Sequence, residues 1–138
     1  MREILFRGKD IKGNWYEGLL THNIAKDEWY ISNKAGIPTA YQVRPETLGQ
    51  YTGLTDKNGI RIFEGDIIKV DDDFDTFGKM AGEIREVWFK DGGFRLKPKY
   101  PSTIARGDRG YWMEDGADFE VIGNVWDNPE LLGGDSDG

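Results

Sequence analysis

Cysteine is absent from this sequence, and histidine occurs only once among its 138 residues. Without cysteine there are no disulfide bonds and no thiolate metal ligands, and one histidine cannot build a multi-histidine metal centre. The chain also has no apolar run long enough to span a membrane, and we expect no secretory segment. We therefore expect a cytoplasmic protein that folds around one apolar core without a cofactor.

The sequence also lacks the apolar spacing of a long amphipathic helix. Instead, 19 glycines separate short apolar runs that are rich in aromatic residues. This composition is typical of short strands joined by tight turns. We expect an all-β single domain over residues 1–132, built as a small, strongly bent antiparallel barrel or sheet, with helix confined to short turns. Residues 133–138 should form a disordered tail.

Two turn signals locate hairpins. Asn58-Gly59 readily adopts positive φ at successive positions, so the chain should reverse there between strands that end near Leu54 and restart near Ile60. Residues 90–93 should connect a strand at 84–89 to one at 94–97. Further strands are expected at 15–20, 29–31, 40–43, 66–70 and 119–126, with single helical turns at Pro45 and Pro129.

Three segments of the chain together resemble one known protein family. The first segment is residues 1–7, which begins Met1-Arg2-Glu3-Ile4 and ends Phe6-Arg7. The second is residues 49–70, which begins Gly49-Gln50-Tyr51-Thr52-Gly53, contains Asn58-Gly59 and Glu64-Gly65-Asp66, and ends at Val70. The third is residues 120–132, which begins Glu120-Val121-Ile122-Gly123-Asn124 and ends at Leu132. On these residues the chain resembles the phage YopX-like family. The resemblance implies a phage or prophage accessory role. It carries over no catalytic motif, because the matching positions are turn glycines, apolar strand residues and acidic turn residues.

Acidic residues outnumber basic ones, and the formal net charge is −7. This balance disfavours sequence-independent binding to nucleic acid, which relies on clustered lysine and arginine and on counterion release. The charges are, however, segregated along the chain. Residues 79–109 hold eight basic and four acidic residues, and a strongly acidic segment, Asp71-Asp72-Asp73-Phe74-Asp75, comes just before them.

That acidic segment is the nearest approach to a metal site. Asp71, Asp73 and Asp75 have the spacing of a calcium loop, in which alternating carboxylates turn onto one cation. Thr76 stands where such a loop needs glycine, and Gly82 stands where it needs a bidentate glutamate. A solvated acidic loop is therefore the simpler interpretation, and we expect no bound metal.

The candidates for catalysis are one histidine, two serines and two carboxylate pairs: His22, Ser32, Ser102, Glu64 with Asp66, and Glu114 with Asp115. Neither serine lies in a nucleophile-elbow pattern. A carboxylate pair could divide acid and base roles if burial raised one pKa, but chance pairs are common in a chain with 25 acidic residues. The first pair is better interpreted as a turn whose carboxylates bond local backbone amides. We expect that the protein is not an enzyme.

The basic segment offers a stronger candidate, a recognition surface. Arg95, Lys97 and Lys99 alternate with apolar residues and should place three cations on one strand face. Neighbouring aromatic and cationic residues extend this set: Tyr100, Arg106, Arg109, Tyr111 and Trp112. Such mixtures bind single-stranded nucleic acid or acidic protein surfaces. The alternative is the ordinary wet face of an antiparallel strand.

These observations favour a non-catalytic binding or interaction module with a protein partner. Nucleic acid is disfavoured by the net charge, no membrane partner is expected, and self-association is left open. Two other functions remain as alternatives: a nucleic-acid-binding module that uses residues 95–112, and a small carboxylate-based hydrolase. Positive potential on one face would favour the first. A cleft with two facing acids of raised pKa would favour the second.

Overall fold

The computed structural model describes residues 4–32, 40–70, 82–90, 92–97, 111–113 and 119–133. Regular structure in these ranges consists of strands and two short 3-10 turns, so the all-β prediction is confirmed. The chain divides into two compact units, Met1–Gly53 and Leu54–Gly138, each of which is described by itself. The prediction of a single domain over 1–132 concerns cooperative folding and stays a prediction.

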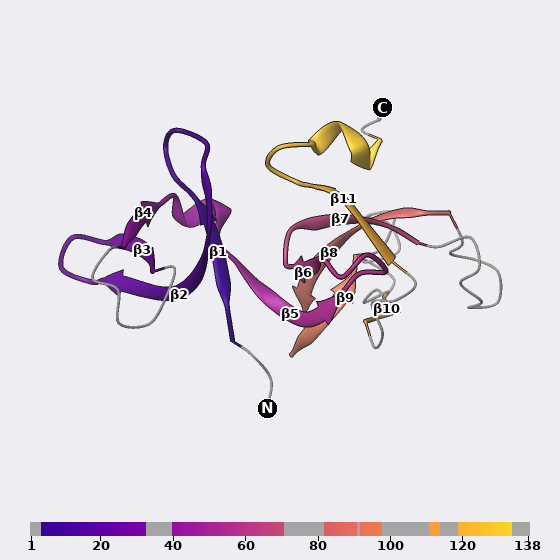
Figure 1. Cartoon of the computed structure of the whole chain (residues 1–138), viewed down its shortest axis with the longest axis horizontal. Helices are drawn as coiled ribbons and strands as arrows, with labels where there is room; N and C mark the ends of the chain where they lie inside the picture. The colour runs from indigo at the N-terminus through magenta and orange to yellow at the C-terminus, as the bar shows by residue number, and fades with distance from the viewer. Residues whose placement is uncertain are drawn as a thin grey trace. The chain divides into compact units, whose positions relative to one another are not determined.

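The first unit is built from short antiparallel strands (Figure 1). Its elements are β1 (Phe6–Lys9), β2 (Trp15–Asn23), β3 (Glu28–Ser32), β4 (Tyr41–Val43), the 3-10 turn η1 (Pro45–Thr47) and the first part of β5 (Gly49–Thr55). Strand β1 pairs with β2 and β5, β2 pairs with β3, and β3 pairs with β4. The strand order is β4-β3-β2-β1-β5-β6, and β5 continues into the second unit.

The second unit holds the rest of β5 and most of the remaining strands. Its elements are β6 (Arg61–Phe63), β7 (Asp66–Val70), β8 (Ile84–Lys90), β9 (Gly93–Leu96), β10 (Tyr111–Trp112), β11 (Phe119–Asn124) and the 3-10 turn η3 (Pro129–Leu132). Strands β7 to β11 form a five-stranded sheet in the order β10-β9-β8-β7-β11. The predicted hairpin at 90–93 is confirmed as the connection between β8 and β9, and the predicted turns at Pro45 and Pro129 are η1 and η3.

Of the two predicted forms, a bent barrel or a sheet, the structure has sheets, because neither strand order returns to its starting strand. In the first unit the chain does come back from β4 to β1, but it does so through η1. The Arg44 amide donates to the Lys9 carbonyl at 2.8 Å, and the Lys9 amide donates to Thr47 Oγ1 at 2.8 Å. A short turn and one hydroxyl thus take the place that a ladder of strand hydrogen bonds would occupy in a barrel.

Close packing between β1 and β4 depends on a glycine. A Cβ added to Gly8 would lie 2.8 Å from Cγ2 of Val43, which is closer than carbon atoms approach in proteins. The same face carries two stacked ring pairs. The rings of Tyr16 and Tyr41 stack with centroids 4.1 Å apart, and those of His22 and Trp29 stack at 3.7 Å. The sheet of the first unit is therefore strongly bent, as predicted, although it does not close.

The apolar core of the second unit lies on one face of its sheet. It consists of residues that are at most 2% exposed: Ile62, Ile68, Val70, Val87, Leu96 and Phe119. Burying each such side chain contributes about 1.5–3 kcal/mol. Val87 and Leu96 are opposite each other in the register of β8 and β9, and the next pair along is Trp88 with Arg95. Because successive residues of a strand point to opposite faces, this second pair faces away from the core.

Two aspartates hold turns in this unit. Asp56 is 4% exposed, and its carboxylate accepts the amides of Asn58 at 2.8 Å, Ile60 at 2.9 Å and Val121 at 2.9 Å. Asp66 accepts the Phe63 amide at 2.7 Å. The interpretation of the segment around Asp66 as a carboxylate-bonded turn is therefore confirmed for that residue. The bond from the Val121 amide to Asp56 also connects the β5–β6 turn to β11, which lies 65 residues further along the chain.

The end of the described chain packs back onto the second unit. The ring of Trp126 lies against the main chain of Gly65, and η3 lies against β8. Gly133 ends η3 in the left-handed conformation, with φ of 72°. The predicted disordered tail covers 133–138, and residues 134–138 lie outside the described residues.

The predicted reversal at Asn58-Gly59 yields the first test. Gly59 has φ of +82°, and nothing lies within 4 Å of an added Cβ, so a substitution there meets backbone strain and no steric clash. We expect Gly59→Val to lower the free energy of unfolding by more than about 1 kcal/mol, since a β-branched residue resists positive φ. Urea unfolding monitored by tryptophan fluorescence measures this. Gly59→Asn is the control and should cost less, because asparagine tolerates this conformation; equal midpoints for Gly59→Val and the unmodified protein would contradict the expectation.

Candidate functional site

Only part of the predicted recognition surface lies within the described residues. Arg95 lies in β9, Lys97 follows it, and Tyr111 and Trp112 form β10. In the register of the sheet, Trp112 is opposite Arg95. The rest of the set lies outside the described residues: Lys99, Tyr100, Arg106 and Arg109. Recognition by the full set stays a prediction.

Arg95 is not a solvent-facing cation. It is 6% exposed, and its Nε donates to the Lys90 carbonyl at 3.1 Å. This hydrogen bond spans the hairpin between β8 and β9 from one strand to the other. A buried guanidinium that bonds the main chain is a structural group, and its removal would disturb the strands that carry its neighbours.

Next to Arg95 lies a group of three side chains that we call the Trp88 cluster: Trp88, Lys90 and Lys97. The ammonium nitrogen of Lys97 lies 5.3 Å from the centroid of the Trp88 ring, and that of Lys90 lies 5.7 Å from it. Both distances are within the range at which a cation is attracted to an aromatic face. The cluster lies on the sheet face that points away from the core, because Trp88 is the register partner of Arg95.

The main chain under Lys97 is firmly held. Its amide donates to the Glu86 carbonyl at 2.8 Å, and its carbonyl accepts Nη1 of Arg85 at 3.1 Å. The Lys97 ammonium is also 3.6 Å from a carboxylate oxygen of Glu86. Both side chains of this ion pair are partly exposed, so the pair contributes little to stability and leaves the lysine able to meet a second anion.

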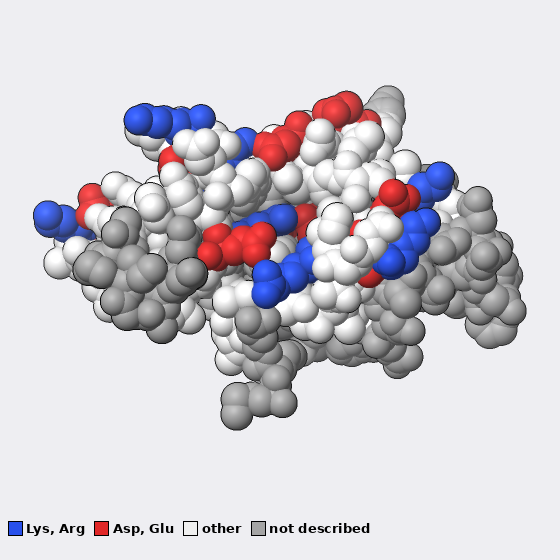
Figure 2. All heavy atoms as spheres, viewed as in Figure 1, with Lys and Arg blue, Asp and Glu red and all other residues white. Residues whose placement is uncertain are grey.

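The Trp88 indole has a further property. Its Nε1 is buried and has no hydrogen-bond acceptor among the residues that the structure describes. An unpaired buried donor costs about 1–3 kcal/mol. On the face that Figure 2 shows, basic side chains lie in small groups, several of them beside acidic ones. The Trp88 cluster therefore combines two cations with one partly buried indole.

Sequence reasoning missed Trp88 and Lys90 as site residues. Trp88 had been assigned to a strand and Lys90 to the following connection, and neither was placed with Lys97. The signal was present in the alternation of Glu86, Trp88 and Lys90 along β8, which sets these residues on the face opposite Val87.

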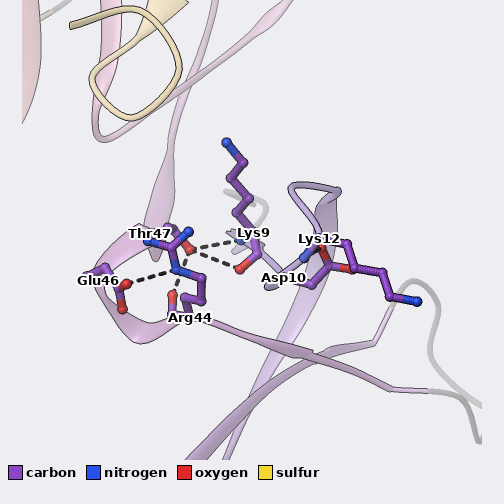
Figure 3. A network of polar contacts seen from close by, with 6 residues as sticks. All are labelled: Lys9, Asp10, Lys12, Arg44, Glu46 and Thr47. Atoms are coloured by element: carbon purple, nitrogen blue, oxygen red, sulfur yellow. Dashed lines mark hydrogen bonds and ion pairs between the residues drawn. The ribbon is translucent and has the colours of Figure 1, made fainter.

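A second polar network lies in the first unit (Figure 3). Thr47 is fully buried, and its hydroxyl donates to the Arg44 carbonyl at 2.6 Å while accepting the Lys9 amide. Nε of Arg44 is 2.9 Å from a carboxylate oxygen of Glu46. The pKa of Glu46 is lowered, first by its own backbone amide and then by Arg44. This network fixes η1 against β1.

Asp10 organises the turn between β1 and β2. Its carboxylate accepts the amides of Lys12 at 2.9 Å and Asn14 at 2.8 Å, and it accepts the hydroxyl of Tyr16 at 3.0 Å. The bond from the Asn14 amide is the main reason why the pKa of Asp10 is lowered. Burial, followed by the bond to Asp10, raises the pKa of Tyr16. An acid with a lowered pKa is a poor proton donor near neutral pH, so Asp10 suits a structural role.

The other catalytic candidates do not come together among the described residues. His22 stacks on Trp29, and its Nε2 lies 2.9 Å from Oδ1 of Asp27. Ser32 ends β3. Glu64 and Asp66 flank Gly65, and the Asp66 carboxylate is used by the Phe63 amide. Three further catalytic candidates and the acidic loop lie outside the described residues: Ser102, Glu114, Asp115, and Asp71, Asp73 and Asp75 of the loop.

The described part of the chain also bears on metal binding and on membrane insertion. No group of three or more histidine, aspartate or glutamate side chains there could hold a metal ion. No helix there is long and apolar enough to cross a membrane.

Comparisons with known proteins agree with this fold. The model of the family described as YopX protein matches residues 6–133. A solved structure, the crystal structure of protein EF1440 from Enterococcus faecalis, has a TM-score of 0.52 and 24% sequence identity, and the match covers 96% of this chain and 99% of that one. No curated protein matches the sequence. The structural match supports the fold alone, because the identity is low.

The contrast between Arg95 and Lys97 gives a test of the site geometry. We expect Arg95→Ser to lower the free energy of unfolding by about 1–3 kcal/mol, because it removes a buried group and its hydrogen bond to the main chain. Lys97→Ser keeps both main-chain bonds and should change that free energy by less than about 0.5 kcal/mol. Chemical denaturation of both variants measures the difference. A larger loss for Lys97→Ser than for Arg95→Ser would contradict this description.

Proposed function

Since the chain belongs to the YopX protein family, we propose that it is a phage or prophage accessory protein that acts in the cytoplasm as a non-catalytic binding module. The family match is the basis of the accessory role. The chemistry of the Trp88 cluster is the basis of the binding role. Its ligand, in this proposal, is a carboxylate-bearing segment of a partner protein.

The observation that carries the proposal is the position of Lys90 and Lys97 around one partly buried indole, on the sheet face opposite Val87 and Leu96. Two ammonium groups attract a carboxylate, and the indole offers apolar area to the residue beside it. Tryptophan is among the residues that most often dominate binding energy at interfaces. Strand β8 carries Trp88 and Lys90, and the main chain of Lys97 is held by two hydrogen bonds, so less entropy is lost on binding than at a free loop.

The size of the charge effects favours a protein ligand over nucleic acid. An exposed ion pair contributes about 0.2–1 kcal/mol, so two lysines need the apolar contact of Trp88 to reach useful affinity. A long polyanion would bring many phosphates close to a chain with a net charge of −7. A protein segment with one or two carboxylates among apolar residues meets the two lysines with much less repulsion.

The use of the described aspartates supports a non-catalytic role. Asp10, Asp56 and Asp66 accept backbone amides, and the pKa of Asp10 is lowered. Carboxylates that hold turns in this way are poor candidates for the acid and base of a hydrolase, which needs one raised pKa. The hydrolase therefore receives no support from the described residues.

The experiment uses a synthetic peptide with two adjacent glutamates next to two leucines, and the same peptide with glutamines. Fluorescence anisotropy of the labelled peptides, titrated with the full-length protein, measures affinity. We expect the glutamate peptide to bind more tightly, and the double substitution Lys90→Ser with Lys97→Ser to weaken its binding about tenfold, which corresponds to about 1.4 kcal/mol.

A matched control removes the same charge elsewhere. Lys12→Ser with Lys26→Ser replaces two exposed lysines in turns of the first unit and should leave peptide binding unchanged. Equal affinity for the two peptides, or no effect of the Lys90 and Lys97 substitutions, would contradict the proposal. Tighter binding of a thymidine oligonucleotide than of the glutamate peptide, lost in the same variant, would instead favour the nucleic-acid alternative.

A further inference from the structure

The β5–β6 turn contains the only asparagine of this sequence that is followed by glycine, in the pair Asn58-Gly59. In such a pair the main-chain nitrogen of glycine attacks the side-chain carbonyl carbon of asparagine, because glycine has no side chain to hinder the approach. Ammonia leaves, the glycine nitrogen loses its proton, and a cyclic succinimide forms. Water then opens the ring to aspartate, or to isoaspartate, in which the main chain runs through the side-chain carbon.

The carbon that is attacked in this reaction is open to solvent. Asn58 is exposed, and its side-chain amide makes no hydrogen bond to the residues that the structure describes. Gly59 is exposed as well, and nothing lies within 4 Å of the position that its Cβ would take. Water therefore reaches both residues, and no neighbouring side chain blocks ring closure.

The attacking nitrogen, by contrast, is held in a hydrogen bond. The Gly59 amide donates to the Asp56 carbonyl at 3.0 Å and closes a turn with aspartate at its first and glycine at its fourth position. Further bonds hold the turn shut: the Asp56 carboxylate accepts the amides of Asn58 and Ile60, and the Asp56 amide donates to the Ile60 carbonyl at 2.7 Å. The nitrogen must lose its proton to attack, so the reaction requires the turn to open.

The isoaspartate product cannot keep these bonds. Oδ1 of Asp56 accepts the Asn58 amide at 2.8 Å and the Ile60 amide at 2.9 Å, so a single oxygen fixes the spacing of the two amides. Isoaspartate at position 58 inserts a carbon atom into the main chain between them and adds a carboxylate near that of Asp56, which it repels. Oδ2 of Asp56 accepts the Val121 amide of β11, and this contact depends on the same carboxylate.

We propose that Asn58 is a site of spontaneous modification that the closed β5–β6 turn protects, and that its conversion to isoaspartate releases β11 from Asp56. The rate of modification in the folded protein is then the rate in the open turn multiplied by the fraction of molecules in which the turn is open. No residue of the Trp88 cluster takes part, so this inference is independent of the proposed function.

The test compares the full-length protein with a synthetic peptide of residues 55–62 at mildly alkaline pH. Mass spectrometry of proteolytic fragments follows the conversion of amide to acid at position 58. We expect the protein to react at least about tenfold more slowly than the peptide, because the turn is open only part of the time. Asn14, an exposed asparagine that is followed by tryptophan, is the internal control and should stay unmodified over the same period.

Hydrogen exchange of the Gly59 amide measures the same opening independently, because exchange also requires the bond to the Asp56 carbonyl to break. The slowing of modification relative to the peptide should match the slowing of Gly59 exchange within about threefold. Modification at the rate of the peptide, or a larger mismatch between the two factors, overturns protection by the turn.

Variants address the role of the carboxylate. Asp56→Ala should speed modification and Gly59 exchange by the same factor. Asp10→Ala, which removes the corresponding carboxylate from the β1–β2 turn, is the matched control and should leave both rates unchanged. If Asp56→Ala does not fold, the comparison between the unmodified protein and the peptide decides the question.

The consequence for β11 is tested on protein that has been aged and separated by ion-exchange chromatography. In the isoaspartate form, the Val121 amide should exchange at least about tenfold faster than in the unmodified form. The Lys97 amide, which donates to the Glu86 carbonyl in the same unit, is the control and should keep its rate. Unchanged exchange of the Val121 amide overturns the release of β11.

Discussion

Tight turns between short strands leave backbone amides without ladder partners, and in this protein aspartate carboxylates accept them. Asp10 does so at the β1–β2 turn and Asp66 at the turn before β7. Asp56 has the widest effect, because its second oxygen accepts the amide of Val121 in β11. A buried carboxylate with three such bonds ties local turn geometry to the packing of the sheet. The arrangement of strands in the second unit depends on this contact.

The same aspartates are committed to holding turns. The pKa of Asp10 is lowered, first by the bond from the Asn14 amide, so this carboxyl is a poor proton donor near neutral pH. In the proposed function, recognition uses the two cations and the indole of the Trp88 cluster instead. The main chain at Lys97 is held by hydrogen bonds to Glu86 and Arg85. Turn stability and the proposed ligand binding therefore draw on different residue types.

Much of the fold follows from local sequence signals. Asn58-Gly59 places a turn because few residues other than glycine adopt positive φ, and the alternation around Val87 assigns its side chain to the core. The choice between barrel and sheet could not be made from the sequence, because closure depends on how the chain returns from β4 to β1. There the Lys9 amide bonds the hydroxyl of Thr47, which is 38 residues away. Arg95 shows the same limit at the site. Alternation correctly set it on the face away from the core, but its burial and its bond to Lys90 arise from the neighbouring strand.

The central claim is that a carboxylate binds where two lysines flank Trp88. A crystal structure of the protein with the glutamate peptide tests it most directly. The account predicts a peptide carboxylate oxygen within about 2.7–3.2 Å of Nζ of Lys90 or Lys97, with a leucine of the peptide against the Trp88 ring. A bound peptide whose carboxylates contact neither lysine would contradict it.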